Sequence, residues 1–311
     1  MGSPDGVTLL DGSMGQELIK RGASGNGLLW AAEALFKSPQ VVREIHQDYI
    51  RAGADIICTN SYSTIRNKFE PAGLMARFEE MNRLAGELAV AARESSGRDV
   101  LIAGSLPPQR GSYRADLVGS YEEIEPLYRE QAKLLAPYVD FFLCETMSSA
   151  DEARAAVSGA AVVGKPVWVS WTLNDSGPPL LRSGETIKQA LEALDGLNVS
   201  ALLVNCSTPE AITAAVPELV SLTDLPVGAY ANGFTPIPHQ WKYQSDEDLP
   251  PARQNLGPEK YLEHARSWLE SGASIIGGCC EIGPGHIACL DSYRAEIQKQ
   301  KHAKNRLLTE C

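Results

Sequence analysis

The sequence predicts a single-domain α/β fold, a (β/α)8 TIM barrel in which parallel strands alternate with helices. Eight short apolar runs are separated by longer segments whose apolar residues recur at three-to-four spacing. The chain has 311 residues, which suits a fold that typically needs about 250. An open doubly wound sheet is the alternative, but no glycine-rich dinucleotide-binding fingerprint follows any of the runs.

The predicted strands are rich in Val, Ile, Leu and Ala, which is typical of parallel strands buried on both faces. They cover residues 7–10, 55–59, 100–105, 141–144, 167–171, 201–205, 227–231 and 274–278. Predicted helices cover residues 39–52, 78–94, 121–136, 150–163 and 259–271, and each begins near an acidic residue, a proline or a serine.

Residues 1–311 are expected to form one domain, because the composition does not shift along the chain. The connection at 232–258 is long for a barrel and rich in Pro, Asn, Gln and charge. It is predicted to be a binding loop or lid, with a plain surface excursion as the alternative. The tail after residue 294 is basic and polar and is predicted to be a final helix with a frayed end.

The charge balance excludes some classes of partner. A net charge of −11 argues against nucleic acid and against an anionic membrane surface. No apolar run reaches about 18 residues and no basic-then-apolar leader is present, which predicts neither a membrane span nor secretion. Seven cysteines without regular spacing are expected to be free thiols or metal ligands in a cytoplasmic protein. A homo-oligomer is compatible with the sequence.

Polar residues cluster at the ends of the predicted strands. In a barrel, the carboxyl ends of all strands lie on one face, and that face carries the active site. We therefore expect one pocket to collect side chains that are far apart in the sequence. The residues at these ends are Asp11, Thr59, Asn60, Ser61, Ser105, Glu145, Asn205, Cys206, Tyr230, Cys279 and Cys280.

Three of these residues form a candidate metal site. Cys279 and Cys280 follow two glycines at the end of the eighth strand, and Cys206 follows the sixth. Three protein ligands with one open position are typical of catalytic zinc, and thiolates suit that metal. The alternative is that the cysteines pack as small apolar side chains, which is our interpretation of Cys58 and Cys144 inside strands.

Two carboxylates are candidate ligand-binding groups. Glu145 closes a buried apolar strand, where a charge is costly without a partner. A ligand ammonium would be such a partner, and a salt bridge to a neighbouring loop is the alternative. Asp11 either contacts the ligand or caps the following helix. Aromatic faces near the strand ends could attract a cation, or could simply pack; these residues are Trp30, Tyr62, Trp171 and Tyr230.

Five segments together resemble the homocysteine S-methyltransferases. These segments are LLDGSMGQEL, YIRAGADIICTNSY, FFLCETMSSADEA, LLVNCSTP and GASIIGGCCEIGPGHI. The resemblance extends from residue 9 to about residue 290. The family includes enzymes that use S-methylmethionine, betaine–homocysteine methyltransferases and the homocysteine module of cobalamin-dependent methionine synthase.

The resemblance implies an enzyme that transfers a methyl group from an onium donor to the homocysteine thiolate and forms methionine. It implies zinc held by Cys206, Cys279 and Cys280. It also implies that Asp11 and Glu145 hold homocysteine, with Glu145 near its ammonium group. The other expected substrate contacts are Trp30, Thr59, Asn60, Ser61, Ser105, Asn205 and Tyr230. Trp30, in LLWAAEAL, matches a tryptophan of both the betaine and the S-methylmethionine branches.

The donor is expected to be a sulfonium, S-methylmethionine or S-adenosylmethionine. No cobalamin or folate module follows the barrel, and the long C-terminal extension of animal betaine enzymes is absent. Betaine or another onium donor is the alternative, because the sequence from Ala231 to Trp241 departs from the one usual in the family. Two further alternatives are a hydrolytic zinc barrel, which usually brings histidine ligands at strand ends, and a non-catalytic protein that binds zinc or homocysteine.

Overall fold

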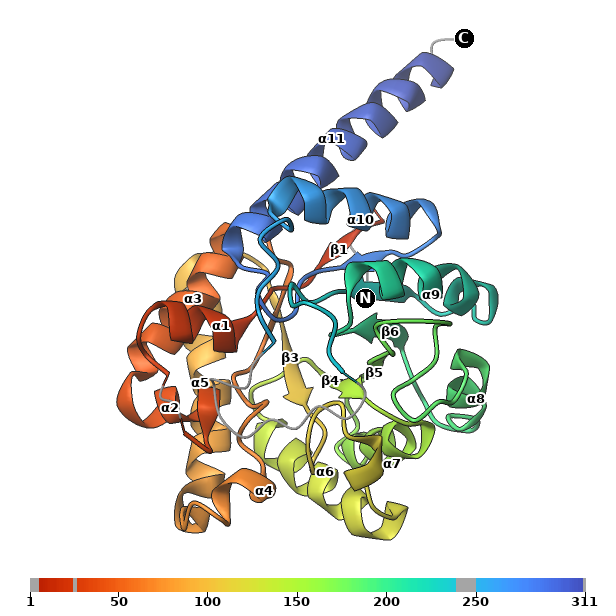
Figure 1. Cartoon of the computed structure of the whole chain (residues 1–311). Helices are drawn as coiled ribbons and strands as arrows, with labels where there is room; N and C mark the ends of the chain where they lie inside the picture. Colours follow the sequence, from red (N-terminus) through yellow and green to blue (C-terminus); the bar gives the residue numbers. More distant parts are fainter. Residues whose placement is uncertain (1–5, 25–26, 239–249, 310–311) are drawn as a thin grey trace.

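Eight parallel strands form the centre of the fold, as predicted (Figure 1). The structure is a computed structural model that describes residues 6–24, 27–238 and 250–309. The strands are β1 (Thr8–Leu9), β2 (Ile56–Cys58), β3 (Leu101–Leu106), β4 (Phe141–Met147), β5 (Val167–Trp171), β6 (Ala201–Asn205), β7 (Val227–Tyr230) and β8 (Ile275–Ile276). Each overlaps a predicted strand.

The strands follow one another around a barrel. Each of β2 to β7 pairs in parallel with the next strand, and β8 also pairs with β1. The ring closes between β1 and β2 through a parallel bridge between Leu10 and Ile56. Backbone hydrogen bonds from Asp11 N to Ile56 O (2.9 Å) and from Asp55 N to Leu9 O (2.8 Å) complete this junction.

Helices cover the outside of the barrel (Figure 1). They are α1 (Met14–Lys20), α2 (Glu33–Lys37), α3 (Pro39–Arg51), α4 (Arg66–Phe69), α5 (Phe78–Ser96), α6 (Tyr121–Leu135), α7 (Ala150–Ala161), α8 (Ile187–Glu192), α9 (Pro209–Ser221), α10 (Pro258–Glu270) and α11 (Pro284–Thr309). Local sequence explains several starts: Ser120 and Glu123 form a capping box on α6, and Thr208 caps α9 ahead of Pro209. The predicted tail helix is α11, which extends beyond the barrel.

The interior of the barrel is apolar along most of its length and polar at the carboxyl ends of the strands. Side chains alternate along a strand, so Phe141 and Leu143 of β4 point into the interior core. Glu145, two residues further, points the same way. The same alternation brings Ser105 of β3 and Tyr230 of β7 to this end. The fold therefore places polar side chains at the carboxyl ends of the strands, next to the apolar interior of the barrel.

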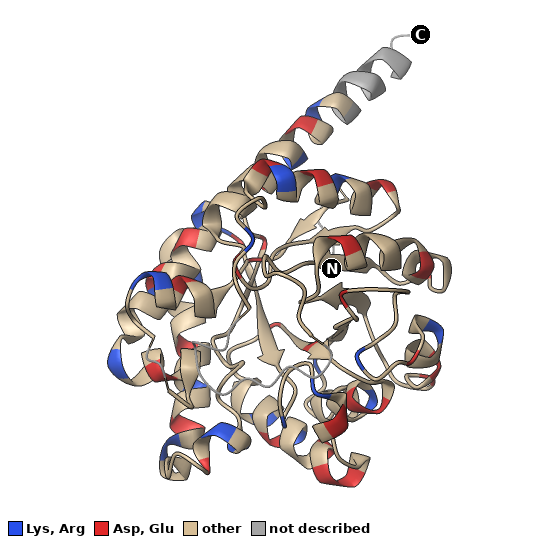
Figure 2. Cartoon of the chain, in the orientation of Figure 1, with Lys and Arg blue, Asp and Glu red and all other residues tan. Residues whose placement is uncertain are grey.

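Charged side chains lie mainly on the outer helices (Figure 2). Helices α6 and α7 begin with acidic residues in their first turns, which the positive end of the helix dipole favours. No helix in the described ranges is long and apolar enough to cross a membrane.

The long connection after β7 lies on the same side as the carboxyl ends of the strands. Phe234 pairs with Ala252 in an antiparallel bridge, and the Ile237 N–H donates to Asp175 Oδ2 at 2.8 Å. Residues 239–249 of this connection lie outside the described residues, so the lid stays a prediction.

Candidate active site

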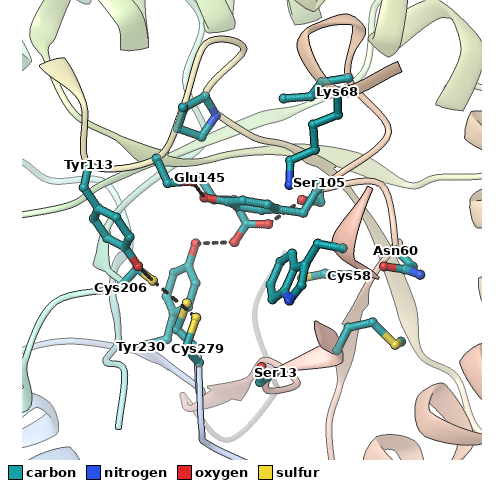
Figure 3. A pocket seen from close by; sticks show the side chains of 18 of the residues that line it. Ser13, Cys58, Asn60, Lys68, Ser105, Tyr113, Glu145, Cys206, Tyr230 and Cys279 are labelled. Atoms are coloured by element: carbon teal, nitrogen blue, oxygen red, sulfur yellow. Dashed lines mark hydrogen bonds between the residues drawn. The ribbon is translucent and has the colours of Figure 1, made fainter. Parts of the chain in front are cut away.

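A cavity of about 410 Å³ opens at the carboxyl ends of the strands (Figure 3). This is the face on which barrel enzymes carry their active sites. Its lining includes most of the residues predicted from the sequence: Asp11, Trp30, Thr59, Asn60, Ser105, Glu145, Cys206, Tyr230, Cys279 and Cys280.

Three thiols converge at one end of the cavity. The sulfur atoms of Cys206, Cys279 and Cys280 all lie within 4.8 Å of one another, and the Cys206 and Cys280 sulfurs are 3.8 Å apart. Ligands about 2.3 Å from a tetrahedral metal lie about 3.8 Å from one another. The spacing therefore fits three ligands of one metal ion, and all three cysteines line the cavity.

The backbone around these thiols is tightly packed. A Cβ on Gly278 would lie 2.2 Å from Ile282 Cγ2, so a side chain at this position would clash with Ile282 and displace the Cys279–Cys280 turn. Cys206 adopts a left-handed φ of 47°, and its carbonyl accepts a hydrogen bond from Thr172 Oγ1 at 3.1 Å. These contacts direct all three sulfurs to the same point.

Tyr113 is a site residue that the sequence analysis missed. It lies in the loop between β3 and α6, is 7% exposed, and its hydroxyl is 2.8 Å from Cys206 Sγ. Burial, and then the neighbouring Cys206 sulfur, raise the pKa of the Tyr113 hydroxyl well above its usual range. The phenol therefore keeps its proton and donates a hydrogen bond to the sulfur. The only sequence signal was a tyrosine in a loop that enters the predicted pocket face.

Glu145 lies inside β4 and not after it, because this strand continues to Met147. Its carboxylate accepts hydrogen bonds from Ser105 Oγ and from the Tyr230 hydroxyl, the latter at 3.3 Å. The register of β4 shifts between Cys144 and Met147, and such bulges re-aim side chains near active sites. Burial raises the Glu145 pKa to about 7. The alternative of a salt bridge from Glu145 to a neighbouring loop stays a prediction, because residues 239–249 of the connection after β7 lie outside the described residues.

Asp11 is also buried in the cavity lining, close enough to Glu145 for the two carboxylates to repel each other. Its Oδ2 accepts the Cys58 N–H at 2.8 Å, and burial raises its pKa to about 7. Asp11 does not cap the following helix, which was its alternative role. Ser13 is the cap, and its hydroxyl accepts a hydrogen bond from the Gln16 N–H at 3.2 Å at the start of α1. Asp11 therefore keeps an oxygen for a ligand, and with Glu145 it makes this end of the cavity a site for a cation.

Ser61 and Asn205 are held below the cavity and do not line it. Ser61 Oγ donates to the Ser105 carbonyl at 2.7 Å. Asn205 accepts the Thr146 N–H at 3.0 Å and donates to Thr146 Oγ1 at 2.9 Å. Asn205 thus supports the bulge that carries Glu145, and its contact with substrate stays a prediction.

The aromatic residues divide into two groups. Trp30, Tyr62 and Tyr230 line the cavity, and the rings of Trp30 and Tyr62 meet edge to face with centroids 6.5 Å apart. Trp171 is fully buried in the core between the strands and the helices. It therefore packs in the core, which was the alternative to binding a cation. We call these three lining rings the aromatic wall, and Tyr230 within it lies beside the thiols, in the same cluster as Cys279.

Left-handed backbone conformations gather around this face. Apart from glycines, five described residues have a positive φ, and each is a cavity-lining residue or directly follows one: Trp30, Tyr113, Thr146, Cys206 and Glu281. Such conformations cost about 1–3 kcal/mol each and persist where the surrounding structure enforces them. Strain is therefore concentrated where the candidate ligands are.

Comparison with known proteins agrees with this geometry. Residues 8–293 match the model of the homocysteine S-methyltransferases. The chain is 31% identical to the homocysteine S-methyltransferase of Escherichia coli (strain K12), over 91% of this chain and 94% of that protein. It is 28% identical to the selenocysteine Se-methyltransferase of Brassica oleracea var. italica, over 92% and 88% of the two chains.

A solved structure shows the same architecture at similar identity. The metallated form of the homocysteine methyltransferase MmuM from Escherichia coli has a TM-score of 0.78 and 32% identity, and the match covers 92% of this chain and 96% of that one. This chain belongs to the homocysteine S-methyltransferase family. As a homocysteine S-methyltransferase, it is an enzyme that transfers a methyl group to homocysteine, and the cavity is its candidate active site.

The packing of Trp30 in this methyltransferase yields a first prediction. A Cβ on Gly15 would lie 2.3 Å from the Trp30 ring, so Gly15→Ala should displace the indole. We expect a loss of about 1–3 kcal/mol in the free energy of unfolding, measured by urea denaturation. Gly285→Ala is the matched control, because it is also the second residue of a helix but has open space around it. Equal stability of both variants would contradict the packing role of Gly15.

The raised pKa of Glu145 predicts a pH-dependent stability. Its value of about 7 in the folded protein exceeds the ordinary 4.5, so its contribution is full below pH 4.5 and is lost as the pH rises to about 7. Compared with the metal-free wild type, Glu145→Gln should therefore gain melting temperature between about pH 5 and about pH 7, by about 2–8 °C. A constant difference across this range would contradict burial of an ionisable Glu145.

Proposed function

We propose that this enzyme transfers a methyl group from S-methylmethionine to the sulfur of homocysteine at a zinc site. The observation that carries the proposal is the group of three thiols that opens into a cavity with two buried carboxylates. The reaction breaks one carbon–sulfur bond of the sulfonium donor and forms one to the acceptor sulfur. The acceptor thiol loses its proton, and both products are methionine.

The donor set fits zinc. Three thiolates suit zinc better than magnesium or calcium, which prefer oxygen ligands, and a three-ligand set with an open position is the catalytic type. Cys206, Cys279 and Cys280 would hold the ion. When bound, zinc supplies a Lewis acid that keeps the acceptor sulfur as a thiolate at neutral pH.

Side chains of the cavity would orient the two substrates. Glu145, held by Ser105 and Tyr230, and Asp11, held by the Cys58 N–H, would bind the acceptor ammonium. A bound ammonium would lower the pKa of both carboxyl groups and keep them ionised. This contact would anchor the acceptor with its sulfur toward the thiols.

The aromatic wall would bind the donor. The faces of Trp30, Tyr62 and Tyr230 attract a sulfonium cation electrostatically. A cavity of about 410 Å³ is near the lower end of the roughly 300–1,000 Å³ range of small-molecule sites. It suits two amino-acid-sized molecules better than a donor that also carries a nucleoside, which favours S-methylmethionine over S-adenosylmethionine.

A donor panel tests this function. Zinc-loaded protein is mixed with homocysteine and, in separate reactions, with S-methylmethionine, S-adenosylmethionine, glycine betaine and dimethylsulfoniopropionate, and methionine is measured. We expect the largest kcat/KM with S-methylmethionine. A preference for betaine would keep the methyl transfer and overturn the proposed donor. Binding of homocysteine without turnover of any donor would favour the non-catalytic alternative.

A further inference from the structure

An ion pair between Arg182 and Asp175 is buried beside the thiols and does not line the cavity. Arg182 Nη2 is 2.9 Å from Asp175 Oδ2, and the two side chains are 1% and 2% exposed. Burying two charges costs several kcal/mol per ion unless other contacts compensate. The attraction between the two charges alone does not account for their burial, so the other contacts of Arg182 and Asp175 matter.

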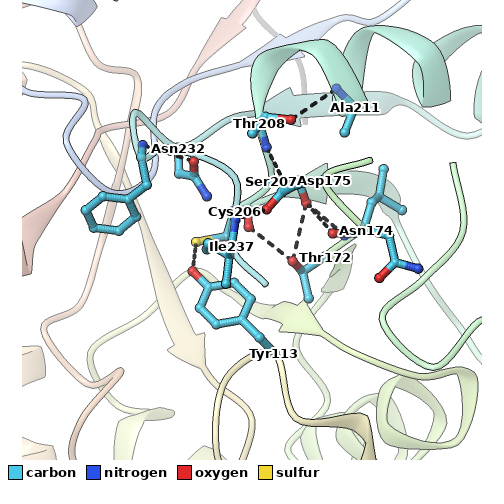
Figure 4. A network of polar contacts seen from close by, with 12 residues as sticks. Tyr113, Thr172, Asn174, Asp175, Cys206, Ser207, Thr208, Ala211, Asn232 and Ile237 are labelled. Atoms are coloured by element: carbon cyan, nitrogen blue, oxygen red, sulfur yellow. Dashed lines mark hydrogen bonds between the residues drawn. The ribbon is translucent and has the colours of Figure 1, made fainter. Parts of the chain in front are cut away.

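Asp175 connects three segments around the metal-ligand turn. Its Oδ1 accepts the Thr208 N–H at 2.7 Å, close to Cys206 in the sequence, and its Oδ2 accepts the Ile237 N–H at 2.8 Å (Figure 4). Arg182 Nη1 donates to the Ile237 carbonyl at 3.1 Å. The pair is thus fixed between the turn after β6 and the connection after β7, and Arg182 has little freedom to move.

Arg182 lies against Tyr113. The guanidinium carbon is 5.1 Å from the centroid of the Tyr113 ring, within the range of a cation–π contact. The Tyr113 backbone has a left-handed φ of 64°, which a tyrosine adopts only when its surroundings enforce it. The ring hydroxyl then reaches Cys206 Sγ at 2.8 Å, as Figure 4 shows.

We propose that Arg182, anchored by Asp175, is a positioning residue for the metal ligand Cys206 and acts through the ring and hydroxyl of Tyr113. This inference rests on the proposed metal site. Contacts behind metal ligands fix the orientation of the ligand and adjust its electron donation. A hydrogen bond to the sulfur withdraws electron density from it, so Tyr113 would weaken its charge donation to the metal and Arg182 would keep that bond in place.

Cobalt substitution tests the inference with a readout other than activity. Co²⁺ held by thiolates absorbs light through sulfur-to-metal charge transfer, at an energy that reflects the electron density of the sulfur. Tyr113→Phe removes the hydroxyl, and Arg182→Lys keeps the charge but loses the planar group. We expect both variants to shift the charge-transfer band to longer wavelength, because the sulfur becomes richer in electrons. We also expect Co²⁺ binding, measured by competition with a chelating dye, to weaken by about 10- to 100-fold, because the orientation of Cys206 is no longer fixed.

Two matched variants and a double variant sharpen the test. Tyr138→Phe removes a hydroxyl that contacts Glu87, and Arg253→Lys changes a guanidinium paired with Glu210; both should leave the cobalt spectrum unchanged. The double variant of Tyr113 and Arg182 should shift the band no further than Tyr113→Phe alone, because Arg182 acts through that ring.

Specific outcomes would overturn the inference. A wild-type spectrum for Arg182→Lys, or an additive shift in the double variant, would show that Arg182 does not act through Tyr113. If Arg182→Lys does not fold, Arg182→Met combined with Asp175→Asn removes both charges together and should give the same shift. Absence of any charge-transfer band in wild-type protein would overturn the metal site itself, and with it this inference.

Discussion

Replacing Cys279 by serine is expected to remove bound zinc and methyl transfer together. A serine hydroxyl is a poor ligand at neutral pH, and only two thiols would remain within 4.8 Å of each other. Structural zinc sites bind with about 10–16 kcal/mol in total, so one of four ligands contributes about 3–4 kcal/mol. We therefore expect zinc affinity to fall by about 100- to 1,000-fold.

The measurement is a zinc titration of metal-free protein with a competing chromophoric chelator, together with methionine formation. Cys289→Ser is the control, because Cys289 lies on α11 and does not belong to the thiol cluster. It should retain wild-type zinc binding and turnover. Full zinc occupancy and activity in Cys279→Ser would contradict the assignment of the three thiols as ligands.

Changing Glu145 to glutamine is expected to weaken homocysteine binding strongly. Glutamine keeps nearly the same shape, and its amide oxygen can accept from Ser105 while its NH2 group donates to the Tyr230 hydroxyl oxygen, but it cannot neutralise an ammonium group. Losing one partner of a buried charge pair costs about 2–5 kcal/mol. This corresponds to a rise of about 30- to 5,000-fold in the dissociation constant, measured by calorimetry with the zinc-loaded protein.

A second buried glutamate provides the matched control. Glu152 on α7 also has its pKa raised by burial to about 7, but its carboxylate accepts from the Ser148 N–H and hydroxyl and does not line the cavity. Glu152→Gln should alter stability and leave homocysteine binding within about twofold. If both variants bind homocysteine as the wild type does, Glu145 does not hold the ammonium group.

The barrel and the thiol cluster were predictable from the sequence because they depend on strong, local signals. Strands buried on both faces appear as apolar runs, and all eight were found. The convergence of Cys206 with Cys279 and Cys280 follows from closure of the barrel, since strand ends meet on one face whatever their distance in the sequence. Each of these arguments needs only the position of a residue relative to its strand.

The residues behind the cavity were not predictable because their roles depend on side-chain direction. Asn205 ends β6 as expected, but its side chain forms hydrogen bonds with Thr146 in the β4 bulge. No pattern in the sequence predicts a bulge there. Tyr113 lies in a loop, and its contact with Cys206 depends on a left-handed backbone. Arg182 would be a surface residue by composition alone, but the structure buries it with Asp175.

The most direct test of the account counts the sulfur neighbours of zinc in solution. X-ray absorption at the zinc edge is measured on zinc-loaded protein before and after homocysteine is added. We predict three sulfur ligands from Cys206, Cys279 and Cys280 in the protein alone, and a fourth sulfur, at about 2.3 Å, when homocysteine binds. A sulfur count that stays the same after homocysteine saturates the protein would contradict this prediction.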